Sequence, residues 1–205
     1  MSDSARPAFP VLRWVVVAWL AVYVPSYAAA YGLANFLFLC NLSVLLLCLG
    51  VWRGSALLVS SQAVGELLVS SVWTLDVATR FVAGRHLMGG TEYMWDARWP
   101  LFTRLLSLHH VAFPLLALWT LRRLGYDRRG ILLQSAIAAA AVSLGRLFGP
   151  EANVNSAFTD PIFHRSWGPA PVHVAVVAGG LILVVYPLTH LLLSTAFRPY
   201  AHPSS

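Results

Sequence analysis

The chain has 205 residues, of which 58% are hydrophobic and only 11% are charged. Soluble domains carry about a quarter charged residues, so this composition excludes a water-soluble fold and predicts an integral membrane protein. The net charge of +6 comes from arginines alone. They are spread over the ends of apolar runs, which is typical of membrane proteins and not of a nucleic-acid-binding patch.

Six apolar runs are long enough to cross a membrane as helices, because a span needs about 20 residues. They cover 11–31, 34–52, 55–81, 100–121, 130–148 and 171–195. These runs lack the alternation of β-barrel strands. We therefore predict an all-α bundle of about six transmembrane helices, forming one membrane domain over residues 1–205. Its loops are short, except for 82–99 and 149–170.

The arginines also predict the orientation of the bundle. The densest cluster is RRLGYDRR at 122–129, between the fourth and fifth runs, and cationic loops favour the cytoplasmic side. With six spans, both termini share that side and both long loops face outward. We predict a multi-pass protein of a bacterial inner membrane with cytoplasmic termini.

The third run carries polar residues at helical spacing. Gln62, Glu66, Trp73, Asp76 and Arg80 recur at steps of three, four or seven, so they form one stripe. Ionisable groups within spans usually face the bundle interior, where they either glue helices together or form a site. The spacing also predicts an ion pair between Asp76 and Arg80.

The fourth run contains two adjacent histidines. Ser107, His110 and Pro114 share one helical face, which makes His110 the interior residue and leaves His109 about 100° away. Pro114 disrupts the backbone hydrogen bond to the carbonyl of His110, so we expect a local polar site there.

Cys40 and Asn41 lie at a similar depth in the second run. A thiol near a histidine and a carboxylate is typical of nucleophilic catalysis. In this interpretation Cys40 is the nucleophile, His109 or His110 is the base, and Asp76 or Asn41 orients the base. The alternative is that Cys40 is simply a small apolar residue. Cys48 is eight residues from Cys40 and is interpreted as packing, with no disulfide.

Four residues are predicted to contact substrate: Trp73, Arg146, Asn153 and Asn155. As alternatives to substrate contact, Arg146 forms an ion pair with Asp76, and the two asparagines cap the loop that contains them. His164 and His173 lie on the same side as the histidine pair. No ligand spacing such as HExxH is present, so we predict no metal and no other cofactor.

Two segments, NFLFLCNLSVLLLCLG at 35–50 and LLSLHHVAFPLLALW at 105–119, resemble the androgen-induced/ADTRP-type intramembrane hydrolases and the related YwaF-like integral membrane proteins. The resemblance implies a multi-span helical fold and hydrolysis of lipid esters by a threonine nucleophile and a histidine. It places the histidine on His109 and a polar residue of the second helix on Asn41. The threonine position falls on Phe38, so Cys40 is the nearest substitute, with Ser43 behind it.

Two functions follow as hypotheses. The first is an intramembrane hydrolase or acyltransferase that acts on lipid esters or thioesters at the outer leaflet. The second is a non-catalytic membrane subunit, lipid-binding module or small transporter. The expected partners are membrane lipids and an acyl-chain substrate, with a homo-oligomer or protein partner in the second case and no nucleic acid in either.

Overall fold

The computed structural model describes residues 7–200, and every regular element in that range is helical. Five helices are long and apolar enough to cross a membrane: Leu12–Tyr31, Ala56–Ala83, Leu101–Leu124, Gly130–Ala152 and Ala170–Ala196. A sixth, Leu39–Arg53, is apolar but shorter. The predicted all-α membrane bundle is therefore confirmed.

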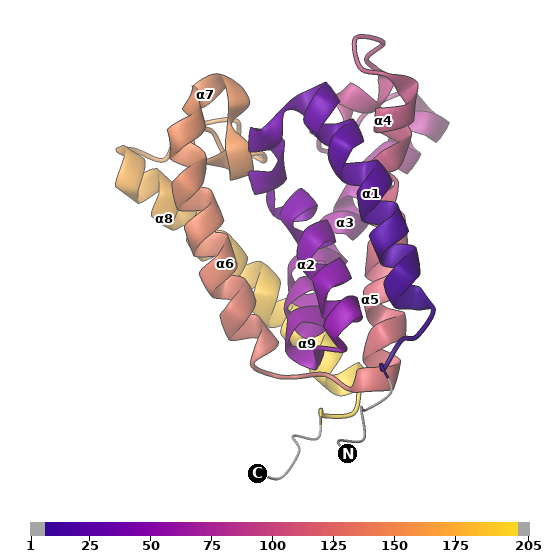
Figure 1. The fold of residues 1–205 in the computed structure, drawn as a ribbon. Coiled ribbons are helices and arrows are strands. Elements are labelled where there is room, and N and C mark those ends of the chain that lie inside the picture. Colours follow the sequence, from indigo (N-terminus) through magenta and orange to yellow (C-terminus); the bar gives the residue numbers. More distant parts are fainter. Residues whose placement is uncertain (1–6, 201–205) are drawn as a thin grey trace, which may run out of the picture.

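The bundle is built around α3 (Ala56–Ala83), which packs against α2 (Leu39–Arg53), α5 (His109–Leu124), α6 (Gly130–Gly145) and α9 (Tyr186–Ala196). At about 1.5 Å per residue, its 28 residues exceed the thickness of a bilayer core. The helix α1 (Leu12–Tyr31) packs mainly on α2. The start of α1 and the end of α9 lie at the same end of the bundle (Figure 1).

Tight turns join the first three helices. A short 3-10 helix, η1 (Leu33–Leu37), follows α1, and the extended backbone of Phe38 separates it from α2. The predicted span at 34–52 therefore begins with a break, and its α-helical part is the shorter α2. At the other end, Gly54 adopts the left-handed conformation and the Ser55 hydroxyl accepts a hydrogen bond from the Leu58 N–H, which caps α3.

The fourth predicted run, 100–121, is interrupted as well, but the break does not lie at Pro114. The segment α4 (Leu101–Leu106) ends at Ser107, and α5 starts at His109 and continues through Pro114. Pro114 therefore does not interrupt α5, and the irregular turn lies just before the two histidines.

Close contact between α3 and α6 depends on glycine. A Cβ at Gly130 would lie 2.9 Å from the backbone nitrogen of Ser61, and one at Gly65 would lie 2.4 Å from Gln134 Nε2. Small residues of this kind let membrane helices approach closely. At Gly179 and Gly180, by contrast, nothing lies within 4 Å of an added Cβ.

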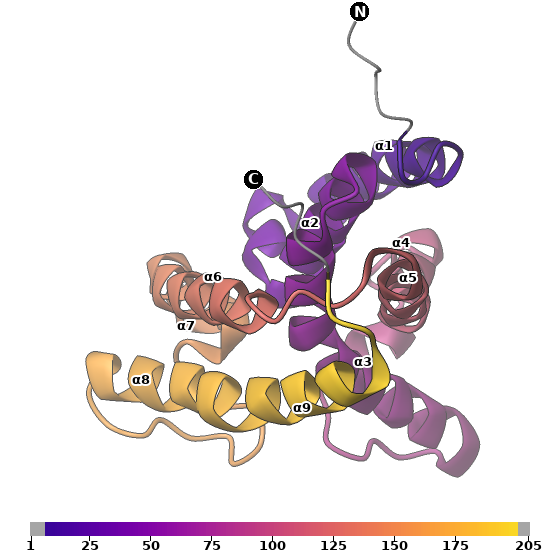
Figure 2. The same ribbon diagram turned by 90° about the horizontal axis from the view of Figure 1, so that it is seen from below.

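The last span combines three segments, α8 (Ala170–Gly180), the π-helical η5 (Leu181–Val185) and α9. Seen along the bundle, they form one long helix that passes beside α6 and α3 (Figure 2). The connections at the end opposite the termini contain the short helices η2 (Glu92–Trp95), η3 (Arg146–Phe148), α7 (Gly149–Ala152) and η4 (Val154–Ser156).

Candidate functional site

A large open cavity of about 860 Å³ lies in the half of the bundle away from the termini. Its walls come from the end of α1, the start of α2, the middle of α3, the start of α5, the α8–η5 segment and both long loops. Ligand pockets usually have volumes of roughly 300–1,000 Å³. The cavity therefore has room for a lipid chain or a molecule of drug size.

His109 is buried beside this cavity and has one free ring nitrogen. Its Nδ1 lies 3.1 Å from the Leu106 carbonyl oxygen, which can only accept, so Nδ1 carries the proton in the neutral ring. Nε2 is then an acceptor, and it is buried with no hydrogen-bond partner among the described residues. A buried acceptor of this kind is suited to take a proton or a hydrogen bond from a ligand.

His110 is also buried, but its ring is held by α3. The ring stacks on Trp73 with centroids 4.5 Å apart, and its Nδ1 lies 3.1 Å from the Ser70 hydroxyl. That hydroxyl also lies 2.8 Å from Glu66 Oε2. The periodicity of the run favoured His110 alone as the interior residue, whereas both rings face inward.

Glu66, Ser70 and His110 form a continuous polar chain. The Ser70 hydroxyl has one proton, so when it donates to Glu66 it must accept from His110, and when it donates to His110 it must accept from a protonated Glu66. The polar stripe predicted from the sequence included Glu66 but not Ser70. Ser70 could have been found from its position four residues after Glu66, which is one turn further along the same face of the helix.

Cys40 lies in the first turn of α2, half-buried on the wall of the cavity. The first-turn N–H groups of Cys40 and Asn41 have no acceptor within the helix. The sulfur has a weak contact with Asn41 Oδ1 at 3.8 Å, and no hydrogen bond joins it to either histidine among the described residues.

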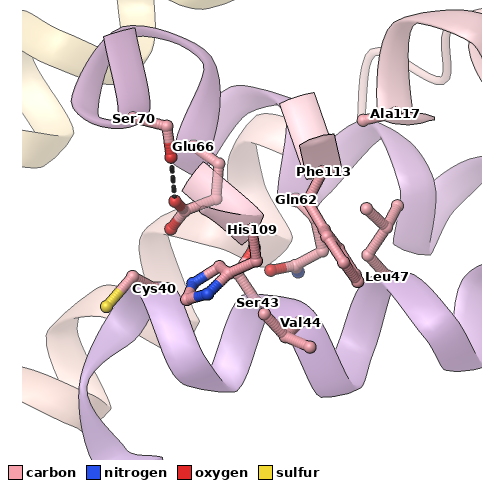
Figure 3. Close-up of a pocket in the computed structure, with 10 residues that line it drawn as sticks. All are labelled: Cys40, Ser43, Val44, Leu47, Gln62, Glu66, Ser70, His109, Phe113 and Ala117. Carbon is pink, nitrogen blue, oxygen red and sulfur yellow. Dashed lines mark hydrogen bonds between the residues drawn. The ribbon is translucent and has the colours of Figure 1, made fainter. Parts of the chain in front are cut away.

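A second, small cavity of about 10 Å³ lies directly behind the large one, and Cys40, Glu66, Ser70 and His109 contribute to its lining. Figure 3 shows Cys40, the Glu66 carboxylate and the His109 ring gathered at one end of it, with the Cys40 sulfur pointing away from the ring. These three groups therefore belong to one local site, although the thiol is not in contact with its predicted base.

Asn41 holds helices together and, among the described residues, makes no hydrogen bond to either histidine. Its Oδ1 accepts a hydrogen bond from the Tyr23 hydroxyl at 2.8 Å, and its Nδ2 donates to the Asn35 carbonyl at 2.7 Å. The ring of Tyr23 in turn packs edge-on against His109, with centroids 5.5 Å apart. Tyr23, which sequence analysis missed, thus connects Asn41 to His109.

Asp76 lies away from the histidines and organises the 84–91 connection. Its Oδ1 accepts from the backbone N–H groups of Leu87, Met88 and Gly89, and its Oδ2 lies 2.9 Å from His86 Nδ1 and also accepts from Thr91. The predicted ion pairs of Asp76 with Arg80 and with Arg146 are both wrong. The distant loop supplies the partners instead.

Of the four predicted substrate contacts, Trp73 and Asn155 line the cavity, whereas Arg146 and Asn153 do not. The Arg146 guanidinium lies over the Phe158 ring and donates to the Ala157 carbonyl at 2.9 Å. Asn153 folds its own loop by accepting from the N–H groups of Phe158 and Thr159.

Asn155 ties three segments together at the edge of the cavity. Its Nδ2 donates to the carbonyls of Leu37 and Ala141, and its Oδ1 accepts from the Leu39 N–H, which begins α2. Asn155 therefore positions the start of the helix that carries Cys40.

The 156–168 connection contributes a carboxylate that sequence analysis missed. Asp160 is buried against the cavity, and its Oδ1 accepts from the N–H groups of Ile162 and Phe163 at 2.9 Å and 2.7 Å. Burial disfavours its charge, but the backbone donors prevail and hold the pKa of Asp160 below its usual range. Its Oδ2 is buried without a hydrogen-bond partner in the described part of the chain.

His173 has a structural position. Its Nδ1 accepts from the Trp167 N–H at 3.2 Å, and its Nε2 donates to the Ser156 carbonyl at 2.9 Å. Within residues 7–200, no three His, Cys, Asp or Glu side chains are grouped so that they could hold a metal ion.

Searches found no matching family model, no similar curated protein and no similar solved structure. The resemblance to intramembrane hydrolases therefore stays a prediction, and the site geometry is the basis for the function proposed below.

Proposed function

We propose that the protein is an intramembrane acyl-transfer enzyme that acts on a lipid ester or thioester, with Cys40 as nucleophile and His109 as general base. The observation that carries the proposal is the free, buried Nε2 of His109 beside the cavity that Cys40 also lines. The hydrogen bond from Nδ1 to Leu106 fixes the tautomer that leaves Nε2 basic.

In the first step, the Cys40 thiol gives its proton to His109 Nε2 and the sulfur attacks the ester carbonyl carbon. The bond to the leaving oxygen or sulfur then breaks, and the leaving group takes the proton from His109. In the second step, His109 removes a proton from water or from an acceptor alcohol. That oxygen attacks the Cys40 thioester, which releases the acid or the new ester and restores the thiol.

The start of α2 supports this chemistry electrostatically. The N–H groups of Cys40 and Asn41 lie in the first turn, where a helix favours negative charge. They are suited to stabilise the thiolate and the oxyanion that forms at the carbonyl. The thiol has to rotate toward His109, as catalytic hydrogen bonds often tighten only when substrate is bound.

The test is to incubate the purified protein with a fluorescent lipid ester and a matching acyl thioester, and to measure the acyl adduct by intact mass and peptide mapping. We expect an adduct on Cys40 in the wild type and none in Cys40→Ser. His109→Gln should lower the acylation rate by about 10²-fold or more.

Cys48→Ser is the matched control, because Cys48 lies in the same helix but is buried in the core. It should react like the wild type. Equal acylation of the wild type, Cys40→Ser and His109→Gln would contradict the proposal.

A second candidate is binding of a lipid-like ligand without catalysis. It is favoured by the position of the Cys40 sulfur, which points away from His109 in Figure 3. Saturable binding of the same lipids with no adduct on the wild type would support this candidate over the enzyme.

A further inference from the structure

We propose that the cavity selects positively charged amphiphiles and rejects anionic ones. This inference concerns the charge of the ligand and does not depend on nucleophilic chemistry at Cys40.

The described residues that line the cavity include two acidic side chains and no arginine. Fourteen arginines give the chain its positive charge, yet among the described residues no arginine lines the cavity. The acidic side chains in its wall are those of Glu66 and Asp160, beside the two histidines. An anionic ligand would therefore enter a low-dielectric space beside acidic groups, with no arginine in the wall to compensate its charge, which is unfavourable.

Glu66 in particular lacks a positive partner. It is 8% exposed and lies within the apolar part of α3, and its hydrogen-bond partner is the neutral Ser70 hydroxyl. None of the ion pairs found in residues 7–200 includes it. A carboxylate inside a membrane is costly unless a cation compensates it, and a cationic ligand in the cavity supplies one.

Asp160 contributes less to this selectivity, because the backbone N–H groups of Ile162 and Phe163 already stabilise its charge. The charge difference between ligands is therefore expected to act mainly through Glu66.

Aromatic rings form much of the remaining wall. Tyr31, Tyr93 and Trp99 gather where α1 meets the 84–100 connection. The centroids of Tyr31 and Trp99 are 4.7 Å apart, and those of Tyr31 and Tyr93 are 6.5 Å apart. The faces of aromatic rings attract organic cations. The cavity thus combines ring faces, an uncompensated carboxylate and apolar volume, which together suit a lipophilic cation.

Tetraphenylphosphonium and tetraphenylborate provide a direct test, because they have nearly the same shape and opposite charge. Binding is measured in detergent by equilibrium dialysis, with triphenylphosphine oxide as a neutral probe. We expect saturable binding of the phosphonium at least about tenfold tighter than that of the borate.

Glu66→Gln retains an acceptor for Ser70 but removes the charge. It should weaken phosphonium binding about tenfold and leave the neutral probe unchanged, which also shows that the cavity is intact. Glu151→Gln is the matched control, since Glu151 is exposed in α7 and does not line the cavity. Its phosphonium affinity should equal that of the wild type.

A further variant keeps the outcomes separate. Trp99→Leu should weaken the phosphonium more than the neutral probe, even if Glu66→Gln does not fold. Phosphonium binding involves no acyl transfer, so failure of that chemistry would not affect this result. Borate binding as tight as that of the phosphonium, or unchanged phosphonium binding in a folded Glu66→Gln protein, would overturn the proposal.

Discussion

The rings of His109 and His110 stack on each other with centroids 4.4 Å apart and an interplanar angle of 27°, yet they belong to different hydrogen-bond systems. His109 is bonded to the carbonyl of Leu106, the last residue of α4, and leaves Nε2 free. His110 is bonded across to Ser70 of α3. Neighbours in the chain are therefore suited to different tasks, with His109 facing a ligand and His110 joining two helices.

A double-mutant cycle on Ser70→Ala and His110→Phe tests whether His110 joins α5 to α3. His110→Phe keeps a ring on Trp73 and removes the hydrogen bond, while Ser70→Ala removes the bridge to Glu66. The two changes should couple by about 1 kcal/mol, because each removes the same buried hydrogen bond. The measurement is the unfolding free energy in detergent, and strictly additive effects would show that the bond adds no stability.

Asp76→Ala should release the 84–91 connection. The carboxylate is 1% exposed and accepts three backbone hydrogen bonds, and bonds to a buried charge are among the stronger ones, so we expect a loss of about 3 kcal/mol. Hydrogen exchange should increase in residues 84–91 first. Asp96→Ala is the control, since Asp96 pairs with the exposed Arg98 and should leave this segment unchanged.

Gly130→Ala should destabilise the bundle by about 1–3 kcal/mol, because the added methyl group meets the backbone of α3 and cannot be accommodated without moving a helix. Gly179→Ala makes the same chemical change at a helical position where a Cβ meets no atom within 4 Å. It should be neutral or slightly stabilising. Thermal melting of both variants checks the prediction, and similar melting temperatures would show that the α3–α6 contact is looser than described.

The lowered pKa of Asp160 predicts that its contribution to the stability of the 156–168 connection depends on pH. Its folded pKa is held below the ordinary value of 3.8, so its stabilising effect is fully present above that value and is lost as the pH falls through the folded pKa. Asp160→Asn should therefore lower the melting temperature near pH 7, and the difference from the wild type should shrink below pH 4. A difference that stays constant down to pH 3 would assign the effect to something other than ionisation.

The helices could be predicted from sequence because each apolar run is long and continuous, as in 55–81 and 130–148. The similar depth of Cys40 and the histidine pair was predicted from the order of the spans, but Glu66 lines the cavity with them where Asp76 was predicted. The partners of Asp76 could not be predicted, because His86 and Thr91 reach it through a loop whose path has no periodicity. Likewise, periodicity placed His109 off the interior face because it assumed an unbroken helix through Ser107 and Leu108.

The π-helical segment Leu181–Val185 has a consequence for the register of the last span. A single wide turn contains one residue more than the α-helical path would need, so everything after it is rotated relative to α8. Tyr186 is the first residue affected, and its hydroxyl accepts a 3.5 Å hydrogen bond from Gln134. Deleting one residue from this segment would turn α9 by about 100° and move Tyr186 away from Gln134. The alignment of the final helix with the rest of the bundle is thus set by one surplus residue in the wall of the cavity.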